Sequence, residues 1–466
     1  MIKNLSRWVA GMAALGMATQ SMAQADGRWE GHIEIPGAPL HVKIALEQDA
    51  DAWQGTIDIP AQGAVALPLS GIAVGTADDD GQRVEFAIRG VPGQPTFRGR
   101  LEGGEIRGRF EQAGASFPFR LGRQAVALAR PQEPRPPFPY ASENVRFESG
   151  AVRLAGTLTI PPGEGPFVAV LLISGSGLQD RDQTLFGHKP FWVLADHLSR
   201  AGIAVLRVDD AGTGQSEAHP SPPTLEDFAA DADAGVDFLR ADARIGTVGL
   251  IGHSEGGAVA PLLASRRDDI GFVVLLAAPG VPGDELMRRQ NERIYAALGF
   301  GANRRDRLLG LLDRLFAMLK SDASVTTATP QVEAIVREQM QANGVPPAEQ
   351  QDAQVSAAAA QALAPAMRAF LRYDPRPALT RTRVPVLALN GERDVQVDAE
   401  QNLPAIRAAL ADADNGDVET HRLPGLNHLF QTAVSGLPNE YGVLEETMAP
   451  LVLDGIRDWI LARAGR

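Results

Sequence analysis

One five-residue segment carries the side chain best suited to covalent chemistry. Residues 252–256 read Gly-His-Ser-Glu-Gly and match the pattern Gly-x-Ser-x-Gly. An apolar run at 248–251 precedes the segment and a helical pattern follows it. In that setting, this pattern places a serine on a tight strand-to-helix turn, and the two glycines give the backbone room to close it. We therefore predict that Ser254 is a nucleophile; the alternative is an ordinary glycine-rich turn.

A serine hydroxyl becomes a useful nucleophile only when a base takes its proton. Two histidines follow Ser254 in the chain. His421 lies within the alternating run 418–423, a predicted strand, whereas His428 lies in the turn-rich segment just beyond that strand. Catalytic groups of open α/β sheets gather beyond the carboxyl ends of the strands. We therefore favour His428 over His421 as the base.

The acid that orients such a histidine should follow an earlier strand. The predicted strand 384–389 runs directly into residues 390–394. Asp394 is our candidate for this acid, and Glu392 and Asp398 are the alternatives.

Acyl transfer also needs hydrogen-bond donors for the developing oxyanion. One donor should be the backbone N–H of Glu255, directly after the candidate nucleophile. The second should come from the glycine-rich loop 174–177, where the backbone N–H of Ser176 is favoured over those of Gly175 and Gly177.

The composition excludes several other chemistries. The 466 residues include no cysteine, which removes disulfides, thiolate nucleophiles and iron–sulfur clusters. None of the eight histidines fits His-Glu-x-x-His, and residues 212–217 lack the third glycine of the dinucleotide fingerprint. We expect neither a metal nor a cofactor. The net charge of −13 repels phosphate backbones, so a nucleic-acid partner is not expected either.

The first residues have the pattern of a secretory signal. Lys3 and Arg7 precede a short apolar stretch at 8–18, and residues 21–23 resemble a cleavage site. We expect residues 1–23 to be removed and the protein to be periplasmic or secreted, with an uncleaved anchor as the alternative. Nothing later in the chain is long and apolar enough to predict a membrane span.

Residues 24–123 predict a small all-β domain. The segment Trp-x-Gly-x-Ile occurs at 29–33 and again at 53–57, and apolar and polar residues alternate along the predicted strands. Residues 97–110 form a predicted hairpin around the pair Gly103-Gly104. We expect an antiparallel barrel or sandwich, followed by a stiff proline-rich linker at 124–141.

Residues 142–466 have a different pattern. Continuous apolar runs alternate with helical segments, which predicts a doubly wound, mostly parallel sheet buried on both faces. Between the runs ending at 277 and beginning at 384 lies a long helical stretch, so we expect a helical cap at about 283–378.

Five segments of this region resemble bacterial α/β-hydrolases of the serine-aminopeptidase-like (S33-type) group, which includes secreted carboxylesterases. The segments are 173–182, 187–191, 249–257, 389–394 and 423–431, and the resemblance extends from about residue 167 to the C-terminus. It implies an α/β-hydrolase fold with Ser254 as nucleophile, Asp394 as acid and His428 as base. The same residues follow from the argument above.

One segment departs from the pattern of such hydrolases. They often read Asp-x-Arg-Gly-x-Gly-x-Ser after the fourth strand, whereas this chain has Ala211 in place of the arginine. The nearby residues Asp180, Arg181 and Asp182 have two equal interpretations. They orient the predicted oxyanion loop, or they form a solvated turn.

These observations predict a serine hydrolase that acts on small carboxylic esters with short to medium acyl chains. An aminopeptidase of the same fold is the first alternative, because a carboxylate such as Glu255 can bind a substrate ammonium group. A non-catalytic binding protein that works through its β domain is the second.

Overall fold

The computed structural model describes residues 25–35, 39–49, 52–60, 64–78, 81–91, 93, 95–112, 114–123, 130–342 and 352–463. The predicted signal segment and the first part of the predicted linker lie outside these residues. The chain divides into two compact units, with most of a β-barrel in one and residues 126–466 in the other. No helix within the described residues is long and apolar enough to cross a membrane.

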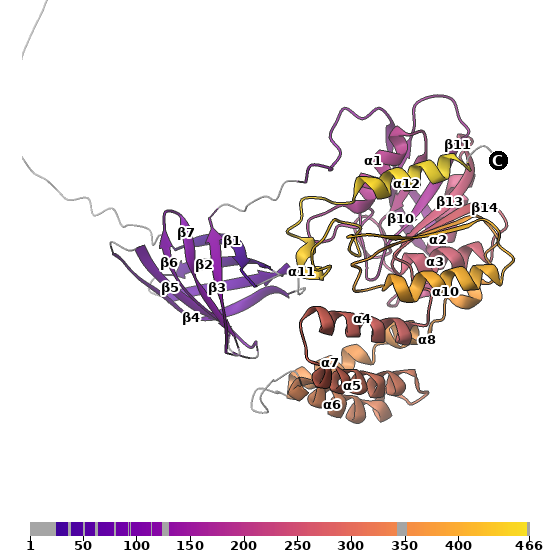
Figure 1. Ribbon diagram of the computed structural model, residues 1–466. Helices are drawn as coiled ribbons and strands as arrows, with labels where there is room; N and C mark the ends of the chain where they lie inside the picture. The colour runs from indigo at the N-terminus through magenta and orange to yellow at the C-terminus, as the bar shows by residue number, and fades with distance from the viewer. Residues whose placement is uncertain are drawn as a thin grey trace, which may run out of the picture. The chain divides into compact units, whose positions relative to one another are not determined.

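The β-barrel is closed and has eight strands in sequence order (Figure 1). The strands are β1 (Gly27–Ile33), β2 (Leu40–Asp49), β3 (Ala52–Ile59), β4 (Ala64–Asp78), β5 (Gly81–Ile88), β6 (Thr96–Glu102), β7 (Glu105–Gln112) and β8 (Ala115–Gly122). Trp29, Phe86 and Phe97 are buried in its core. The predicted all-β segment is confirmed, and of the two architectures it is the barrel. The predicted hairpin is also confirmed, because Gly103 and Gly104 both have positive φ between β6 and β7.

The second unit is built on an eight-stranded sheet in the order β16-β15-β14-β13-β11-β12-β10-β9. Its strands are β9 (Ala141–Ser149), β10 (Val152–Ile160), β11 (Phe167–Ile173), β12 (Ala204–Val208), β13 (Ile245–His253), β14 (Ile270–Leu276), β15 (Val386–Gly391) and β16 (Val418–Leu423). The strand β10 pairs antiparallel with β9 and β12, and the other neighbours are parallel. The carboxyl ends of the parallel strands therefore lie along one edge.

Helices cover both faces of this sheet because its central strands are apolar throughout. On one face lie α1 (Pro190–Arg200) and α12 (Pro450–Leu461) (Figure 1). The other face packs against α2 (Leu225–Arg240), α3 (Gly256–Ala264), α9 (Arg376–Leu379) and α10 (Ala399–Ala411). The short helix α11 (Pro438–Tyr441) lies in the segment between β16 and α12.

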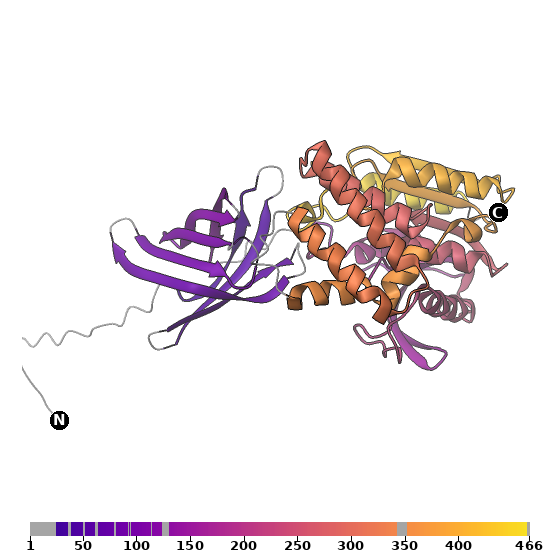
Figure 2. The ribbon, with the colours of Figure 1, turned by 90° about the horizontal axis from the view of Figure 1, so that it is seen from below.

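Five further helices are inserted between β14 and β15. They are α4 (Gly283–Ala297), α5 (Ala302–Lys320), α6 (Val325–Ala342), α7 (Asp352–Ala362) and α8 (Pro365–Arg372). Leucines at helical spacing in α5 pack with apolar residues of α6, α7 and α8 in a core of their own. Figure 1 and Figure 2 both show α5, α6 and α7 side by side. We refer to residues 283–372 as the helical insertion.

Part of the predicted linker is bound to the second unit. The Arg130 guanidinium donates to the backbone carbonyls of Phe186 (3.3 Å), Gly187 (3.2 Å), Gly442 (2.9 Å) and Leu444. The Gln132 side chain donates to Met448 O (2.6 Å) and accepts from the N–H groups of the 447–448 backbone. Residues 130–132 therefore hold the segment that joins α11 to α12.

Candidate active site

The turn between β13 and α3 is strained and tightly packed. Ser254 has a φ of +54°, a conformation that residues other than glycine rarely adopt. A Cβ atom at Gly252 would lie 2.1 Å from the Gly256 carbonyl oxygen, and one at Gly256 would lie 2.2 Å from Ile173 O. Only glycine fits at either position. The backbone therefore closes directly behind the serine, as expected for a strand-to-helix turn of this kind.

A cavity of about 430 Å³ opens at Ser254. One side is formed by Ser254, Glu255, Ser176 and Gly177, and the helical insertion supplies the other with Leu286, Met287, Gln290, Ala366, Met367 and Phe370. A second cavity of about 660 Å³ adjoins it, because both are lined by Gly177, Glu255, Pro279, Leu286, Ala366 and Phe370. The surfaces that face Ser254 are mostly apolar.

The structure brings Asp394 and His428 together. The segment after β16 carries His428, and its Nδ1 atom lies 2.8 Å from Asp394 Oδ2. Asp394 is fully buried, and its Oδ1 atom accepts from the backbone N–H groups of Gln396 (2.8 Å) and Val397 (2.9 Å). Because an ionised carboxylate only accepts hydrogen bonds, it fixes the proton of a neutral His428 on Nδ1. The Nε2 atom then keeps its lone pair.

The alternative residues lie in other environments. His421 is in β16 with 53% of its side chain exposed, beside Glu419 at 3.4 Å. Glu392 accepts from the Gly425 N–H (3.1 Å) and pairs with an arginine, and Asp398 caps the start of α10. Of the three candidate acids, Asp394 is the one that contacts His428.

The loop after β11 passes directly against the Ser254 turn. A Cβ atom at Gly175 would lie 3.3 Å from Ser254 Cβ, which shows how closely the two backbones approach. The Ser176 hydroxyl hydrogen-bonds the Glu255 carboxyl group, and burial raises the pKa of that carboxyl above its ordinary value. Ser176 and Glu255, the two predicted donors, thus lie side by side at the cavity that contains Ser254.

Comparison with known proteins places this geometry in a family. The family model described as serine aminopeptidase, S33, matches residues 191–432, more than half of the chain. The chain belongs to the serine aminopeptidase S33 family. The matched region contains the Ser254 turn, Asp394 and His428, and the sheet that carries them has the α/β-hydrolase fold that the resemblance implied.

Several relatives of this S33 family member are known. The esterase EstD of Thermotoga maritima is 36% identical over 163 residues, which make up 35% of this chain and 39% of EstD. The chain thus matches about two fifths of the length of that relative. Among solved structures, an esterase of Pyrococcus furiosus has 13% identity, with 73% of this chain and 99% of that one covered, at a TM-score of 0.43. A proline iminopeptidase of Mycobacterium smegmatis has 15% identity, with 69% and 99% covered, at a TM-score of 0.41.

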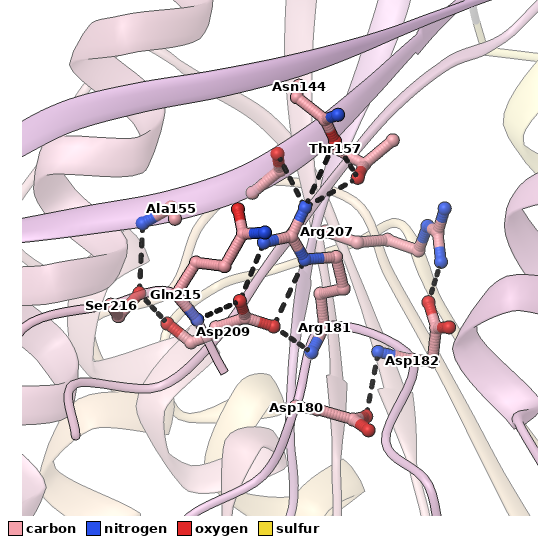
Figure 3. A network of polar contacts seen from close by, with 11 residues as sticks. Asn144, Ala155, Thr157, Asp180, Arg181, Asp182, Arg207, Asp209, Gln215 and Ser216 are labelled. Carbon is pink, nitrogen blue, oxygen red and sulfur yellow. Dashed lines mark hydrogen bonds and ion pairs between the residues drawn. The ribbon is translucent and has the colours of Figure 1, made fainter. Parts of the chain in front are cut away.

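In this S33 chain the residues 180–182 anchor the loop after β11 rather than forming a solvated turn. Figure 3 shows Arg181 reaching Asp209, which follows β12, with Nη2 2.6 Å and Nε 3.0 Å from the two carboxylate oxygens. The Arg181 guanidinium also donates to Gly156 O (2.9 Å) and Thr157 Oγ1 (2.8 Å) of β10. On its other side, Asp182 forms an ion pair with the buried Arg207 of β12.

This anchor explains the departure at Ala211. Ala211 is buried among the apolar side chains of Val152 and Leu154. Asp209 nevertheless has a cation, because Arg181 supplies one from the loop after β11. Gly214 is required beside it, since a Cβ atom there would lie 2.4 Å from Asp209 Oδ2. The loop is therefore fixed to the sheet without the usual arginine.

Two functional neighbours were missed from the sequence. The His253 ring is buried, with its centroid 4.9 Å from that of His428, and it hydrogen-bonds Gln183 and the His428 carbonyl. Gln183 directly follows segment 173–182, one of the five segments that resemble other hydrolases, but nothing in the neighbouring sequence indicates that it contacts His253. Within the described residues, no group of three or more histidine and acidic side chains is placed to hold a metal ion.

Proposed function

We propose that this protein is a serine hydrolase that cleaves carboxylic esters through Ser254, His428 and Asp394. The observation that carries the proposal is the 2.8 Å contact between His428 Nδ1 and the buried Asp394 carboxylate, together with a cavity that exposes Ser254 on a strained turn. Membership of the S33 family and the partial match to an esterase support it.

The proposed reaction proceeds in two halves. His428 Nε2 takes the hydroxyl proton as Ser254 Oγ attacks the acyl carbon, and the Asp394 carboxylate stabilises the imidazolium. The backbone N–H groups of Glu255 and Ser176 are proposed to bind the oxyanion. The tetrahedral intermediate expels the alcohol, which receives the proton from His428. Water then attacks the acyl-enzyme by the same route and releases the carboxylic acid.

The helical insertion is proposed to act as a cap that defines the substrate. It supplies Leu286, Ala366 and Phe370 to both cavities, and their combined walls are largely apolar. Volumes of about 430 and 660 Å³ suit small organic ligands rather than a folded protein or polymer chain. We therefore propose esters with short to medium acyl chains as substrates.

A second candidate activity is removal of N-terminal residues from peptides. The Glu255 carboxyl group is favourable for this activity, because it lines both cavities and directly follows Ser254. An ionised Glu255 would pair with a substrate ammonium group. Comparing p-nitrophenyl esters with aminoacyl p-nitroanilides separates the activities, and Glu255→Gln should reduce only hydrolysis of the anilides.

The nucleophile is tested by labelling with a fluorophosphonate probe. Ser254→Ala should lower kcat by about 10⁶-fold and abolish labelling, whereas Ser265→Ala, at the end of α3, should change neither. Mass spectrometry should find the adduct on the peptide that contains Ser254. An adduct on another serine would contradict the assignment of Ser254, and an unlabelled wild-type protein would contradict the proposal and favour a binding protein.

The two late histidines provide a matched pair for the base. His428→Ala should abolish turnover without unfolding the protein, because its ring contacts Asp394. His421→Ala should keep most activity, since that side chain is exposed in β16. Activity that survives in His428→Ala and is lost in His421→Ala would reverse the assignment.

Export to the periplasm or medium is proposed from residues 1–23 alone. Lys3 and Arg7, followed by the apolar stretch 8–18, support a secretory signal. N-terminal sequencing of the protein from the native cell envelope should begin after Ala23. A chain that retains residues 1–23 would contradict signal cleavage.

A further inference from the structure

A chain of three hydrogen bonds links the loops around Ser254. The Gly175 N–H donates to Gln183 Oε1 (3.2 Å), and Gln183 Nε2 lies 2.9 Å from His253 Nδ1. At the other end, His253 Nε2 lies 3.0 Å from the His428 carbonyl oxygen. Gln183 is 1% exposed and His253 is 5% exposed. We call these two side chains the Gln183–His253 strut.

The direction of every hydrogen bond in the strut is fixed by a backbone group at each end. A carbonyl oxygen only accepts, so His253 Nε2 carries the ring proton and His253 Nδ1 is an acceptor. The group facing Nδ1 must then be the amide nitrogen of Gln183. Its amide oxygen is left for the Gly175 N–H, which only donates. One tautomer and one amide orientation satisfy all four groups.

The surroundings keep His253 in this neutral form. Burial, together with the neighbouring His428, lowers the pKa of His253 to about 3. His428 is the titratable group that faces the ring, and the other neighbours are the Gln183 amide and the Phe430 ring at 6.5 Å. His253 therefore accepts the Gln183 hydrogen bond throughout the neutral pH range.

We propose that Gln183 and His253 are positioning residues that hold the oxyanion loop, the nucleophile turn and the base loop in register. Gly175 directly precedes Ser176, His253 directly precedes Ser254, and the last hydrogen bond ends on His428 itself. The strut thus connects His428 with the residues that directly precede Ser176 and Ser254. This inference rests on the proposed hydrolase function.

The backbone is strained at Gln183 and at Ser254, and this strain supports the positioning role. Gln183 has a φ of +51° and Ser254 a φ of +54°, both in the left-handed region that residues other than glycine rarely adopt. The Gln183 N–H donates to Asp180 O (2.8 Å), so the same residue closes the anchored turn 180–183 and aims its amide at His253. The anchor on Asp209 and the strut therefore act on one loop.

The first test compares Gln183→Met with Thr184→Val in the full-length protein. Methionine keeps the volume but removes both hydrogen bonds, whereas Thr184 is exposed next to the strut. Because small displacements of catalytic groups are costly, Gln183→Met should lower kcat about 10²-fold and leave KM within about threefold. Thr184→Val should match the wild type. An unchanged kcat in folded Gln183→Met would overturn the proposal.

The second test uses Gln183→Glu to give the strut a pH dependence. The introduced carboxylate accepts from Gly175 but cannot donate to His253 Nδ1, so the three hydrogen bonds re-form only when the new carboxyl group and His253 together take up one proton. The carboxylate should raise the pKa of His253 from about 3. The ratio of Gln183→Glu to wild-type kcat should therefore rise as the pH falls from 8 to 6, and the ratio for Gln183→Met should stay flat. Parallel profiles for all three proteins would refute the proposal.

Histidine-selective ¹⁵N NMR tests the hydrogen-bond chain without measuring turnover. The wild-type protein should show His253 protonated on Nε2 alone, and Gln183→Glu should show both nitrogens protonated at low pH. If the wild type has this tautomer but hydrolyses no ester, the proposed function fails while the hydrogen-bond chain stands. If His253 is protonated on Nδ1 in the wild type, the strut itself is wrong.

Discussion

Replacing Asp394 with asparagine changes one oxygen to nitrogen at the centre of the proposed triad. The carboxylate of Asp394 receives hydrogen bonds on both oxygens. Its Oδ1 atom accepts from two backbone N–H groups, and its Oδ2 atom accepts from His428 Nδ1 at 2.8 Å and Asn390 Nδ2 at 3.2 Å. The amide oxygen of the variant must stay with the two backbone donors. The amide nitrogen must therefore face His428.

That arrangement forces the wrong tautomer on the base. An amide nitrogen donates, so His428 Nδ1 must become an acceptor and the ring proton must move to Nε2, which can no longer accept the Ser254 proton. We expect kcat/KM to fall about 10⁴-fold, equivalent to about 5.4 kcal/mol. Asn390 cannot turn away, because its Nδ2 also donates to Val397 O at 2.8 Å. Two donors then face each other, and stability should fall by about 1–3 kcal/mol.

The assay is kcat/KM for a p-nitrophenyl ester, with circular dichroism and urea unfolding as checks on the fold. Asp398→Asn is the matched control, because Asp398 is equally buried in the same segment but pairs with Arg289 (3.5 Å) and Arg293 (3.1 Å) of α4. It should retain activity within about tenfold, since it leaves the His428 tautomer unchanged. Full activity in Asp394→Asn, or a dead Asp398→Asn, would refute the reasoning.

Three further predictions concern the supports of the site. Arg181→Met should cost about 3–5 kcal/mol of unfolding free energy in urea, because it leaves the Asp209 carboxylate buried and unpaired; the exposed Arg153→Met control should cost at most about 1 kcal/mol. A truncated protein that begins at residue 130 should keep the proposed esterase activity, whereas one that begins at 142 should lose stability, because Arg130 and Gln132 hold residues 442–448; equal melting temperatures would contradict this. Burial and the charge of Arg130 lower the pKa of His188 to about 4 in the folded protein. As the pH falls below about 6.5, His188 therefore takes up a proton in the unfolded chain but not in the folded one, and this lowers the stability. Between pH 7 and 5 the wild type should therefore lose about 2 kcal/mol more than His188→Asn, and equal losses in denaturant titrations would refute the shift.

The sequence was sufficient for the parts of the site that depend on local chemistry. The glycines around Ser254 are required by contacts within a few residues or with the adjacent strand, so the pattern and the strained turn go together. His428 and Asp394 could be placed because parallel strands bring their carboxyl ends to one edge, whichever residues fill the sheet. The strands of the N-terminal domain followed from period-two alternation, but that pattern does not distinguish a barrel from a sandwich.

Contacts between segments far apart in the sequence could not be predicted in this way. Arg130 binds carbonyl groups more than 300 residues away, and a proline-rich stretch gives no sign that its end is docked. Gln183 has the same difficulty. Its amide is defined by His253, 70 residues later, and by a carbonyl a further 175 residues on. Sequence spacing cannot rank such partners, because a glutamine on a loop is usually solvated.

Ala211 stands where the sequence pattern predicts an arginine, and the structure shows how Asp209 is paired without it. A residue missing from a pattern suggests that an interaction is missing too. Here the interaction is the pairing of the Asp209 carboxylate with a cation, and that cation can be attached to another part of the chain. Arg181 supplies it from 28 residues upstream, and its own backbone N–H also donates to Asp209 at 2.8 Å. Because Arg181 belongs to the same loop as Ser176, the proposed oxyanion donor, the ion pair couples the stability of the sheet edge to the position of Ser176. A chain with the arginine at 211 would stabilise Asp209 without that coupling. Arg181→Met should therefore lower kcat as well as stability, and introducing arginine at 211 in that background should not restore kcat, because the new guanidinium group would not be attached to the loop after β11.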